Sequence, residues 1–404
     1  MDVFIARRPV LDRFSKVYGY KLVHSSMSEP HAIENSEDSA LQLIDNSMLV
    51  FNLESLASGK RVFFTFTHEA LANECAELLP RESAVIDLHP SVRPDEEHVS
   101  ACMQLYDAGY TIAAPYLYAR GDDNGLLDLA DIISVDFRHW PNHQVMTDQI
   151  GPLGKSKTIL ARSVDSMDEY KLALDLGCTY VEGQFFSKPI IVAGQDIPGF
   201  KPNYLKLLQE LSEDELNFKH LNEIISREVS LAYKLLRLVN SPLFGLRVKV
   251  NAIDRALMML GERGIRQWAS VIAVSELSSS APPELIITSA VRARFCQLIG
   301  EHLGEKELAQ DLFLMGLFSL LDAISSRPLD QVIEELGIDG DVKDALNGEP
   351  NALRPIYELV LAYEQGSWDE VTALASQVGI ERSDVPGLYL PAVEWANSSL
   401  AMTT

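Results

Sequence analysis

Eight short runs of β-branched and aromatic residues recur over the first 190 residues, and they constrain the fold of this chain more than any other feature. They cover 3–8, 18–25, 61–67, 84–89, 111–116, 132–137, 157–162 and 180–186, mostly with apolar residues at helical spacing between them. Eight strands with intervening helices is the count of a (β/α)₈ barrel. On this alternation alone, an open doubly wound sheet fits almost as well.

The connection between the first two runs is too short for a parallel crossover. Only residues 9–17 separate them, whereas a crossover needs about a dozen residues and a helix. The first two strands are therefore predicted to be antiparallel neighbours.

Strand signals stop near residue 190. Residues 191–202 form a linker that contains Pro198, Pro202, Gly194 and Gly199, and everything after it has helical spacing. Long helices are predicted at 283–303 and 308–325. The organisation expected is therefore an α/β barrel at 1–190, a Pro/Gly linker at 191–202 and an all-α domain at 203–404.

Two helix boundaries are predicted from single residues in the second domain. Ser212 precedes an acidic run at 213–215, which is typical of a helix N-terminus. Gly261 is a suitable stop for a helix at 252–260, with Asn251 as its N-cap.

The amino-acid composition limits the classes of partner that this chain can bind. The 404 residues are 47% hydrophobic and include 34 Lys and Arg against 58 Asp and Glu, a net charge of -24. This balance repels nucleic acid and anionic membranes. The most apolar stretch, 312–321, is about half the length of a membrane helix. No signal peptide precedes the first charged residues, and the four scattered cysteines are typical of a reducing compartment. We expect a cytoplasmic protein without nucleic-acid or membrane partners.

Two strand motifs resemble the EAL domain, the cyclic di-GMP phosphodiesterase barrel. The segment VYGYKLV at 17–23 resembles the strand that carries the Glu-Ala-Leu signature, and YVEGQFFSKP at 180–189 resembles the closing strand. Lys21 occupies the position of the first glutamate. At the other functional positions of the family, this chain has Thr65, Asp87, Pro115, Tyr116, Ser134, Asp136, Arg162, Asp165 and Glu182.

The resemblance implies two metal ions at this site, and the residues argue against them. Asp87 and Asp136 keep carboxylates, with Asp165 as a third candidate, but Lys21 and Arg162 offer only donors and positive charge. We expect ion pairs in place of metal, with no catalytic residue and no cofactor. A phosphate-recognising cleft is the functional alternative.

The second domain resembles the HDOD domain, a metal-free relative of the HD hydrolases, over about residues 202–390. The resemblance rests on SLAYKLLRLVNSPLFG at 230–245, ALMMLG at 256–261 and IRQW at 265–268. In GLFSL at 316–320, Ser319 and Leu320 stand where the hydrolases carry His and Asp. The residues expected to shape this domain, or to present a surface to a partner, are Arg237, Asn240, Ser241, Pro242, Gly261, Arg266 and Trp268.

Asn240 is expected to act as a latch. It follows the apolar stripe of its helix and could join the helix end to the loop at 242–245, with Arg266 and Trp268 packed over that loop. A contact residue for a partner is the alternative role.

The two resemblances together imply an EAL–HDOD signalling protein linked to cyclic di-GMP. We expect a catalytically inactive protein that acts through unidentified signalling proteins, with motility or biofilm behaviour as the output implied by the family. A homodimer is left open. The alternatives are a cyclic di-GMP receptor without hydrolysis and an active phosphodiesterase. The lost glutamate and the bulk of Pro115 and Tyr116 argue against binding of the nucleotide.

Overall fold

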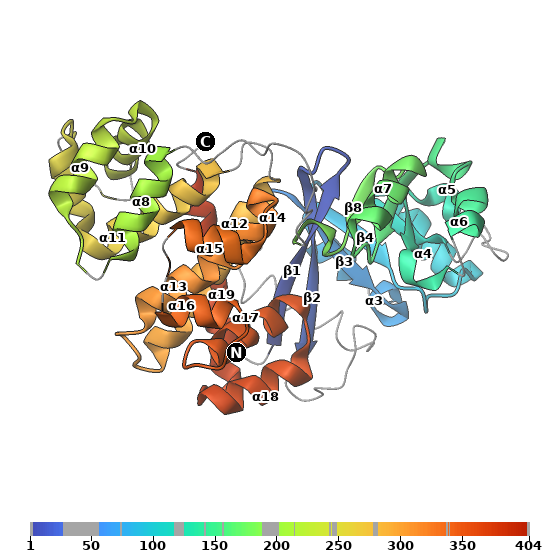
Figure 1. Cartoon of the computed structure of the whole chain (residues 1–404). Coiled ribbons are helices and arrows are strands. Elements are labelled where there is room, and N and C mark those ends of the chain that lie inside the picture. The colour runs from blue at the N-terminus through green and yellow to red at the C-terminus, as the bar shows by residue number, and fades with distance from the viewer. Residues whose placement is uncertain are drawn as a thin grey trace. The chain divides into compact units, whose positions relative to one another are not determined.

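The chain divides into two compact units. One unit comprises Met1–Lys188 with Leu361–Leu390, and the other comprises Pro189–Val360 with Pro391–Thr404. The computed structural model (Figure 1) describes residues 3–26, 56–72, 75–116, 125–140, 143–155, 157–187, 202–213, 215–241, 244, 249–277, 282–336, 338 and 340–401. The predicted linker at 191–202 lies outside these ranges except for Pro202, which begins a helix.

The first unit is built on a closed eight-stranded barrel with the strands in sequence order. The strands are β1 (Val3–Asp12), β2 (Val17–Ser26), β3 (Arg61–Phe66), β4 (Ala84–Leu88), β5 (Thr111–Pro115), β6 (Ile132–Asp136), β7 (Thr158–Arg162) and β8 (Tyr180–Glu182). Strand β1 is antiparallel to both β2 and β8, and all other neighbours are parallel. The predicted barrel and its antiparallel first strand are confirmed.

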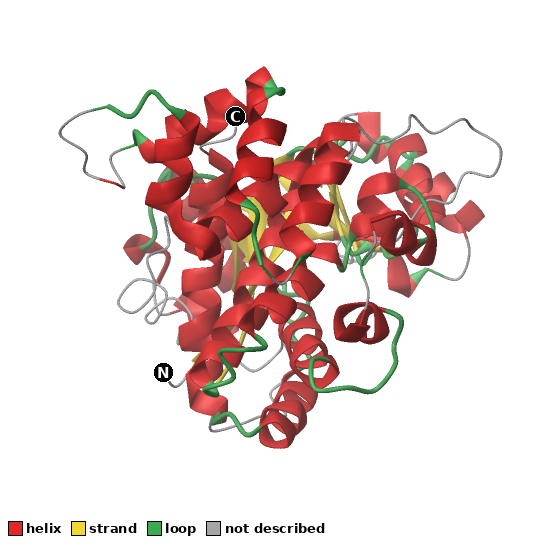
Figure 2. Cartoon of the chain, turned by 60° about the vertical axis from the view of Figure 1, so that its left-hand side comes forward, coloured by secondary structure: helices red, strands yellow, loops and turns green. Residues whose placement is uncertain are grey.

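The helices of this unit follow the strands that they connect, as the parallel topology requires. They are α3 (His68–Ala72), α4 (Glu96–Asp107), α5 (Leu126–Leu129), α6 (His143–Ile150) and α7 (Met167–Asp175). Figure 2 shows that the described strands lie together in the barrel while the rest of the regular structure is helical. The helix expected around residues 41–49 lies outside the described residues.

Side chains of alternating residues fill the barrel. A buried layer consists of Val10, Phe63, Val85, Ala113, Ile132 and Leu160, with Tyr18 and Tyr180 packed against it. Because side chains on one face of a strand recur every second residue, the next inward position on each parallel strand lies closer to its C-terminal end. Those positions carry most of the candidate site.

The β1–β2 hairpin is covered by a segment from near the C-terminus. Tyr363 donates a hydrogen bond from its hydroxyl to the carbonyl of Ile5 (3.0 Å). The rings of Tyr363 and Trp368 pack on Phe4, with centroids 6.1 and 5.4 Å away. The Nη2 of Arg8 donates to the carbonyl of Gln365 (2.6 Å).

This packing differs from the predicted domain limits, which assigned 361–390 to the helical domain. The division between the units instead falls within α17 (Arg354–Gln365) and α19 (Val385–Ala401), and α18 (Trp368–Val378) belongs with the barrel. Within the described residues, the β1–β2 connection is a short turn that supplies no helix to cover the outer face of β1. Residues from the distant segment therefore bury Phe4 completely.

The second unit is helical. Besides the parts of α17 and α19, its helices are α8 (Pro202–Ser212), α9 (Phe218–Ser226), α10 (Val229–Val239), α11 (Ile253–Leu277), α12 (Pro283–His302), α13 (Ala309–Phe318), α14 (Leu321–Ser325), α15 (Leu329–Leu336) and α16 (Gly340–Leu346). Helices α12 and α13 approach closely, since a Cβ on Gly316 would lie 2.6 Å from the backbone of Ala293. None of the helices within the described ranges is long and apolar enough to span a membrane.

Three helix boundaries predicted from the sequence agree with the structure to different degrees. Gly261 interrupts α11 with φ +67° and ψ 172°, a backbone conformation that favours glycine, so the predicted stop is confirmed as a kink. Ser212 ends α8 instead of starting a helix, and its hydroxyl donates to the carbonyl of Leu208. The single helix predicted at 308–325 is two helices, with Ser319 and Leu320 at the break.

Candidate functional site

The barrel carries a polar layer at the C-terminal half of its parallel strands. Each of these residues follows a residue of the buried apolar layer by two positions: Thr65, Asp87, Pro115, Ser134, Arg162 and Glu182. Lys21 on β2 is in register with Phe63 and therefore points to the same side of the sheet. The period of two along each strand thus brings together positions that are far apart in the sequence.

Asp87 is the centre of this layer, and two cations contact it. Its Oδ2 lies 2.5 Å from Nη2 of Arg162 and 3.9 Å from Nζ of Lys21. The Asp87 side chain is 1% exposed, while those of Arg162 and Lys21 are 13% and 15% exposed. The Arg162 contact is an ion pair without the alignment of a hydrogen bond. The carboxylate is therefore neutralised by charge inside the barrel.

Glu182 extends the cluster on the other side of Arg162. Its Oε2 lies 3.6 Å from Nε of Arg162. Burial by itself raises the pKa of Glu182, but the charges of Lys21, Arg162 and Arg8 together hold that pKa below its ordinary value. Burial likewise lowers the pKa of Arg162, and the carboxylates of Asp87 and Glu182 more than offset it, so the net shift is upward. The shifts of Glu182 and Arg162 therefore both favour the charged form of the side chain.

These residues do not fit the metal ions that the EAL resemblance implies. A divalent cation needs several free oxygen ligands, and here Lys21 and Arg162 contact the oxygen of Asp87 that would bind it. Bringing a further positive charge beside two buried cations is also electrostatically unfavourable. In the part of the chain that the structure describes, no group of three or more His, Cys, Asp or Glu residues is arranged to hold a metal ion.

Three other predicted site residues, Asp136, Asp165 and Tyr116, bind residues outside this cluster. Asp136 forms an ion pair with Arg138 (2.7 Å) at the mouth, although its charge still acts on Arg162 and Glu182. Asp165 is exposed and accepts a hydrogen bond from the backbone N–H of Gln184 (3.1 Å).

Tyr116 stacks on Trp140, with ring centroids 5.6 Å apart, and is only half-buried. The contact places its ring beside Trp140, and the predicted role of filling the cleft stays a prediction. The remaining three side chains are small: the Ser134 hydroxyl lies 3.5 Å from the carbonyl of Ala114, Thr65 is half-buried beside Asp87 in the strand register, and Pro115 is buried at the end of β5.

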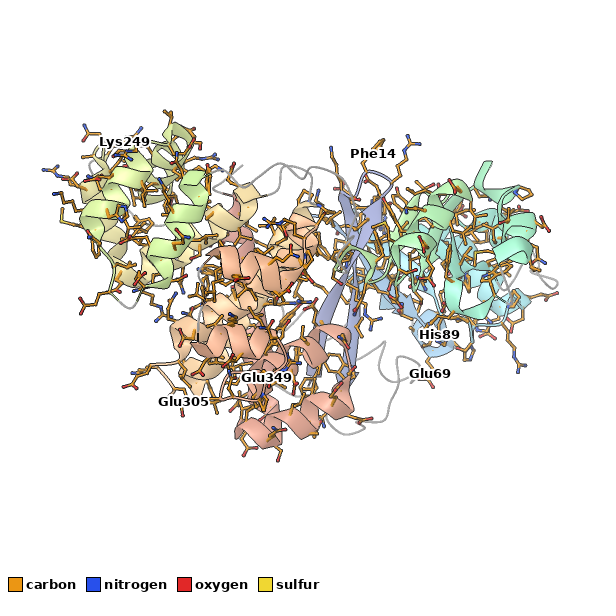
Figure 3. All side chains as sticks on the ribbon, in the orientation of Figure 1. Phe14, Glu69, His89, Lys249, Glu305 and Glu349 are labelled. Carbon is orange, nitrogen blue, oxygen red and sulfur yellow. The ribbon has the colours of Figure 1, made fainter. Side chains whose placement is uncertain are left out.

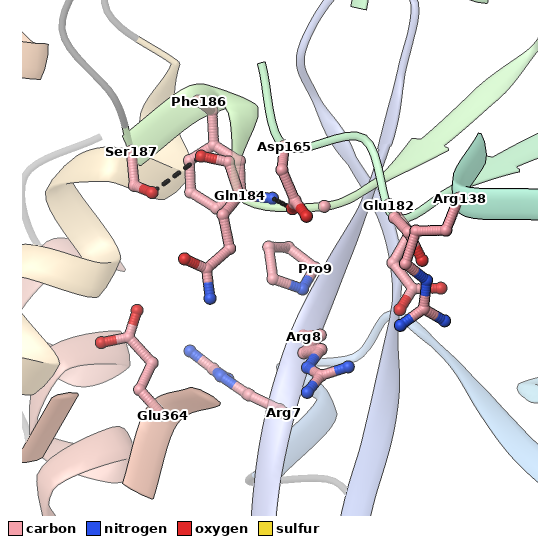
Figure 4. A pocket seen from close by; sticks show the side chains of 12 residues that line it. Arg7, Arg8, Pro9, Arg138, Asp165, Glu182, Gln184, Phe186, Ser187 and Glu364 are labelled. Atoms are coloured by element: carbon pink, nitrogen blue, oxygen red, sulfur yellow. Dashed lines mark hydrogen bonds between the residues drawn. The ribbon is translucent and has the colours of Figure 1, made fainter. Parts of the chain in front are cut away.

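A cavity of about 330 Å³ opens beside the cluster (Figure 4). Its lining combines three arginines with three carboxylates and several polar residues: Arg7, Arg8, Pro9, Arg138, Ser163, Asp165, Glu182, Gly183, Gln184, Phe186, Ser187 and Glu364. Sequence reasoning missed Arg8, Arg138 and Glu364. Arg8 and Arg138 lie close to recognised motifs, but no local pattern indicates that Glu364 lines the same cavity.

Not every arginine of this cavity is available to a ligand. The guanidinium of Arg7 donates to the carbonyl of Leu56 (2.7 Å) and lies 4.3 Å from the ring centroid of Tyr20. Arg8 is held by the carbonyl of Gln365. The Arg138 side chain is 63% exposed but is paired with Asp136, so an anion that binds it must compete with that carboxylate.

In the helical unit, Asn240 forms a latch of the expected kind, and its partner beyond its own helix is Val250. Its Nδ2 donates to the carbonyls of Leu236 (2.8 Å) and Val250 (2.7 Å), and its Oδ1 accepts from the N–H of Val250 (2.7 Å). The side chain thus joins the end of α10 to the residues just before α11. The predicted attachment at 242–245 falls mainly outside the described residues.

Arg266 caps the C-terminus of α8, a contact that the sequence did not predict. Its Nη1 donates to the carbonyls of Leu211 (2.6 Å) and Glu213 (2.7 Å), at the C-terminus of α8, where a positive charge is favourable. The predicted packing of Arg266 and Trp268 over the loop at 242–245 falls mainly outside the described residues.

The other residues expected to shape this unit or to contact a partner differ in how far they are buried. Trp268 is buried and Arg237 is exposed on α10. The hydroxyl of Ser241 is buried without a hydrogen-bond partner, and Pro242 is outside the described residues.

The two degenerate HD positions lie in the core. The Ser319 hydroxyl accepts from Nη1 of Arg292 (3.1 Å) and donates to the carbonyl of Gly316 (2.7 Å). Leu320 is 3% exposed. A buried arginine therefore contacts the position at which the hydrolases carry a metal-binding histidine, and the neighbouring position offers no ligand atom.

Comparisons with known proteins agree with the two-domain reading. The HDOD domain family matches residues 197–324. YuxH of Bacillus subtilis, an uncharacterized protein, is 30% identical over 98% of this chain and 99% of its own length. Cyclic di-GMP phosphodiesterase CdgJ of Vibrio cholerae is 28% identical over 97% of this chain and 92% of its own length.

Solved structures with similar barrels include the PaMucR phosphodiesterase in complex with cyclic di-GMP. It is 13% identical, covers 45% of this chain and 94% of that chain, and has a TM-score of 0.38. Klebsiella pneumoniae BlrP1 in complex with calcium and cyclic di-GMP is 15% identical over 47% of this chain and 56% of that chain, also with a TM-score of 0.38. The full-length match to YuxH, together with the HDOD match, shows that this chain belongs to the family of EAL–HDOD two-domain proteins.

Proposed function

We propose that this protein is a catalytically inactive member of the cyclic di-GMP signalling network and acts through contacts with other proteins. The observation that carries the proposal is the position of Asp87 between Lys21 and Arg162. The metal-dependent hydrolysis of a phosphodiester needs a metal-bound water. In this barrel, cations of the protein take the place at which the metal ions would bind.

The link to cyclic di-GMP is supported by the name of the relative CdgJ and by the EAL-type closing strand of this chain. CdgJ is named as a phosphodiesterase, so the family includes an enzyme. The exchange of a glutamate for Lys21 and the arginine at 162 support a different activity for this chain.

The helical unit supports a role in protein contacts. Val229 and Tyr233, one turn apart on α10, are 82% and 65% exposed, and Met258 on α11 is 67% exposed. Val229 and Tyr233 lie on one face of α10, and exposed apolar side chains that share a face are typical of interaction sites. A cytoplasmic location and homodimer formation stay predictions.

A receptor that binds cyclic di-GMP without hydrolysis is the second candidate. The cavity at the mouth favours it, because exposed Arg138 could pair with a phosphate. Calorimetry with cyclic di-GMP separates the two candidates. Heat of binding that Arg138→Ala abolishes would support the receptor, whereas no binding would support the pure interaction protein.

The test of inactivity is hydrolysis of cyclic di-GMP with Mg²⁺ or Mn²⁺, with CdgJ as the positive control. We expect the protein to hydrolyse the nucleotide no faster than buffer. We also expect no activity in Lys21→Glu, since Arg162 still pairs with Asp87. Turnover by the wild-type protein that Asp87→Asn abolishes would refute the proposal, and activity in Lys21→Glu would show that the single lysine blocks the site.

A further inference from the structure

A second cavity of about 990 Å³ lies at the opposite end of the barrel from the candidate site. It is lined by the end of β1 and by the starts of β2, β3 and β8, so it opens at the N-terminal ends of the parallel strands. Chemistry in barrels of this kind is found at the other end. The function proposed above makes no use of this cavity.

The cavity concentrates positive charge on a chain whose net charge is -24. Arg13, Lys16, Lys60 and Arg61 line it, with Asp12 as the one carboxylate among its lining residues. Within the residues that the structure describes, Arg13, Lys16 and Lys60 form no ion pair with a carboxylate. Unpaired cations around a concave surface raise the local concentration of anions.

The single carboxylate holds the hairpin turn, and among the described residues it forms no ion pair with these cations. Oδ1 of Asp12 accepts hydrogen bonds from the N–H groups of Phe14 (2.8 Å) and Lys16 (2.9 Å). The backbone N–H of Asp12 donates to the carbonyl of Lys16 (2.8 Å), and Ser15 adopts a φ of +58°. The turn is thereby fixed with Arg13, Phe14 and Lys16 at the rim.

Aromatic side chains accompany the cations. Phe14 is 68% exposed on this turn, where Figure 3 labels it. Tyr18 and Tyr180 stack in the wall, with ring centroids 3.9 Å apart, and the guanidinium of Arg61 lies 5.6 Å from the ring of Tyr18. Arg61 is held in place by a hydrogen bond to the hydroxyl of Thr111 (2.7 Å). A preorganised arginine beside rings is suited to a ligand with both a charged and a planar part.

We propose that this cavity binds a small anion that combines a planar ring with a phosphate, that is, a nucleoside phosphate. Lys16 and Lys60 pair with the phosphate, and Phe14 contacts the ring. The volume is within the range of small-molecule sites, about 300–1,000 Å³. Binding here does not depend on the presence or absence of hydrolysis at the other end of the barrel.

The test is calorimetry of the full-length protein with AMP and GMP, and with guanosine and ribose 5-phosphate as the two halves of the ligand. We expect the nucleotides to bind more tightly than either half. In Lys16→Glu/Lys60→Glu, nucleotide affinity should fall about a hundredfold or more, because each of the two charge-assisted hydrogen bonds contributes about tenfold or more to the affinity. Phe14→Ala should weaken the nucleotides and guanosine while leaving ribose 5-phosphate unchanged.

Two matched controls locate the binding. Arg138→Ala changes the arginine at the other mouth, and Lys219→Glu/Arg227→Glu makes the same change of charge on exposed residues of the helical unit. Neither should alter nucleotide binding. Thermal melts identify any charge-reversal variant that is misfolded, and Lys16→Gln/Lys60→Gln then replaces it.

The proposal is overturned if no nucleotide binds more tightly than about 1 mM. It is also overturned if binding survives the changes at Lys16 and Lys60, or if Arg138→Ala abolishes it. The last result would place the nucleotide at the mouth of the barrel and would support the receptor candidate instead.

Discussion

Replacement of Asp87 by alanine should destabilise the barrel strongly. The change removes the carboxylate that Arg162 and Lys21 contact at 2.5 and 3.9 Å, while both cations stay mostly buried. Glu182, whose Oε2 lies 3.6 Å from Nε of Arg162, is then left to balance the positive charges of both Arg162 and Lys21. Breaking a buried ion pair by removal of one partner costs about 3–5 kcal/mol. For a unit of this size each kcal/mol lowers the melting temperature by about 2–4 °C, so the barrel should melt roughly 10 °C lower.

The measurement is chemical and thermal unfolding of wild type and Asp87→Ala in the full-length protein. Asp168→Ala is the matched control, because it removes one carboxylate from an exposed pair with Lys171, and it should cost less than about 1 kcal/mol. A triple variant, Lys21→Met/Asp87→Leu/Arg162→Met, should recover most of the lost stability, since apolar residues of similar volume can replace a buried ion cluster.

The reasoning would be refuted by a loss below about 1 kcal/mol in Asp87→Ala, the range of an exposed pair. It would equally be refuted if Mg²⁺ raised the melting temperature of the wild-type protein but not that of Asp87→Ala, because Asp87 would then be a metal ligand. Either result would show that the two cations do not neutralise Asp87 in solution.

Three further predictions concern other parts of the chain. Asn240→Ala removes three hydrogen bonds at the end of α10 and should lower the free energy of unfolding by about 1–3 kcal/mol, which a lower melting temperature of the helical unit would show. If the melting temperature is unchanged and capture of a native partner is lost, Asn240 is a recognition residue instead. Trp368→Ala uncovers Phe4 and should lower the free energy of unfolding of the barrel unit by about 3–5 kcal/mol, measured by thermal unfolding. A loss of stability confined to the helical unit would contradict this expectation. Because the pKa of Glu182 is lowered in the folded protein, its contribution to stability is present above its ordinary pKa of 4.5 and is lost as pH falls through the lower folded value. An acid titration of stability should show this loss in wild type and less of it in Glu182→Gln.

The sequence by itself determined the strands of the barrel and the direction of the first one, because those signals are local, whereas the choice of a closed barrel over an open sheet depended on the resemblance to the EAL domain. Alternating β-type and helical patterns predict the strands within a few residues, and the short connection at 9–17 is enough to make the first strand antiparallel. Gly261 was also identified locally, since a residue with φ +67° favours glycine. The identity of Lys21 was sufficient to question a metal site.

Local patterns were less reliable where two elements compete for the same residues. The acidic run after Ser212 is typical of a helix start, yet Arg266 from α11 caps the carbonyls there, so α8 ends at that point. The apolar run at 308–325 has helical spacing throughout. The helix is nevertheless interrupted at Ser319 and Leu320, where the Ser319 hydroxyl bonds to the buried Arg292 of another helix.

Only the tertiary structure decided which charges meet. Asp87, Arg162 and Glu182 are widely separated along the chain, and closure of the barrel determines that Arg162 lies between the two carboxylates. Likewise, no local signal shows that residues 361–390 cover β1, since the contact between Tyr363 and Ile5 joins residues 358 positions apart. The sequence specifies each element through interactions between near neighbours, while the site arises from contacts that exist only once the barrel has closed.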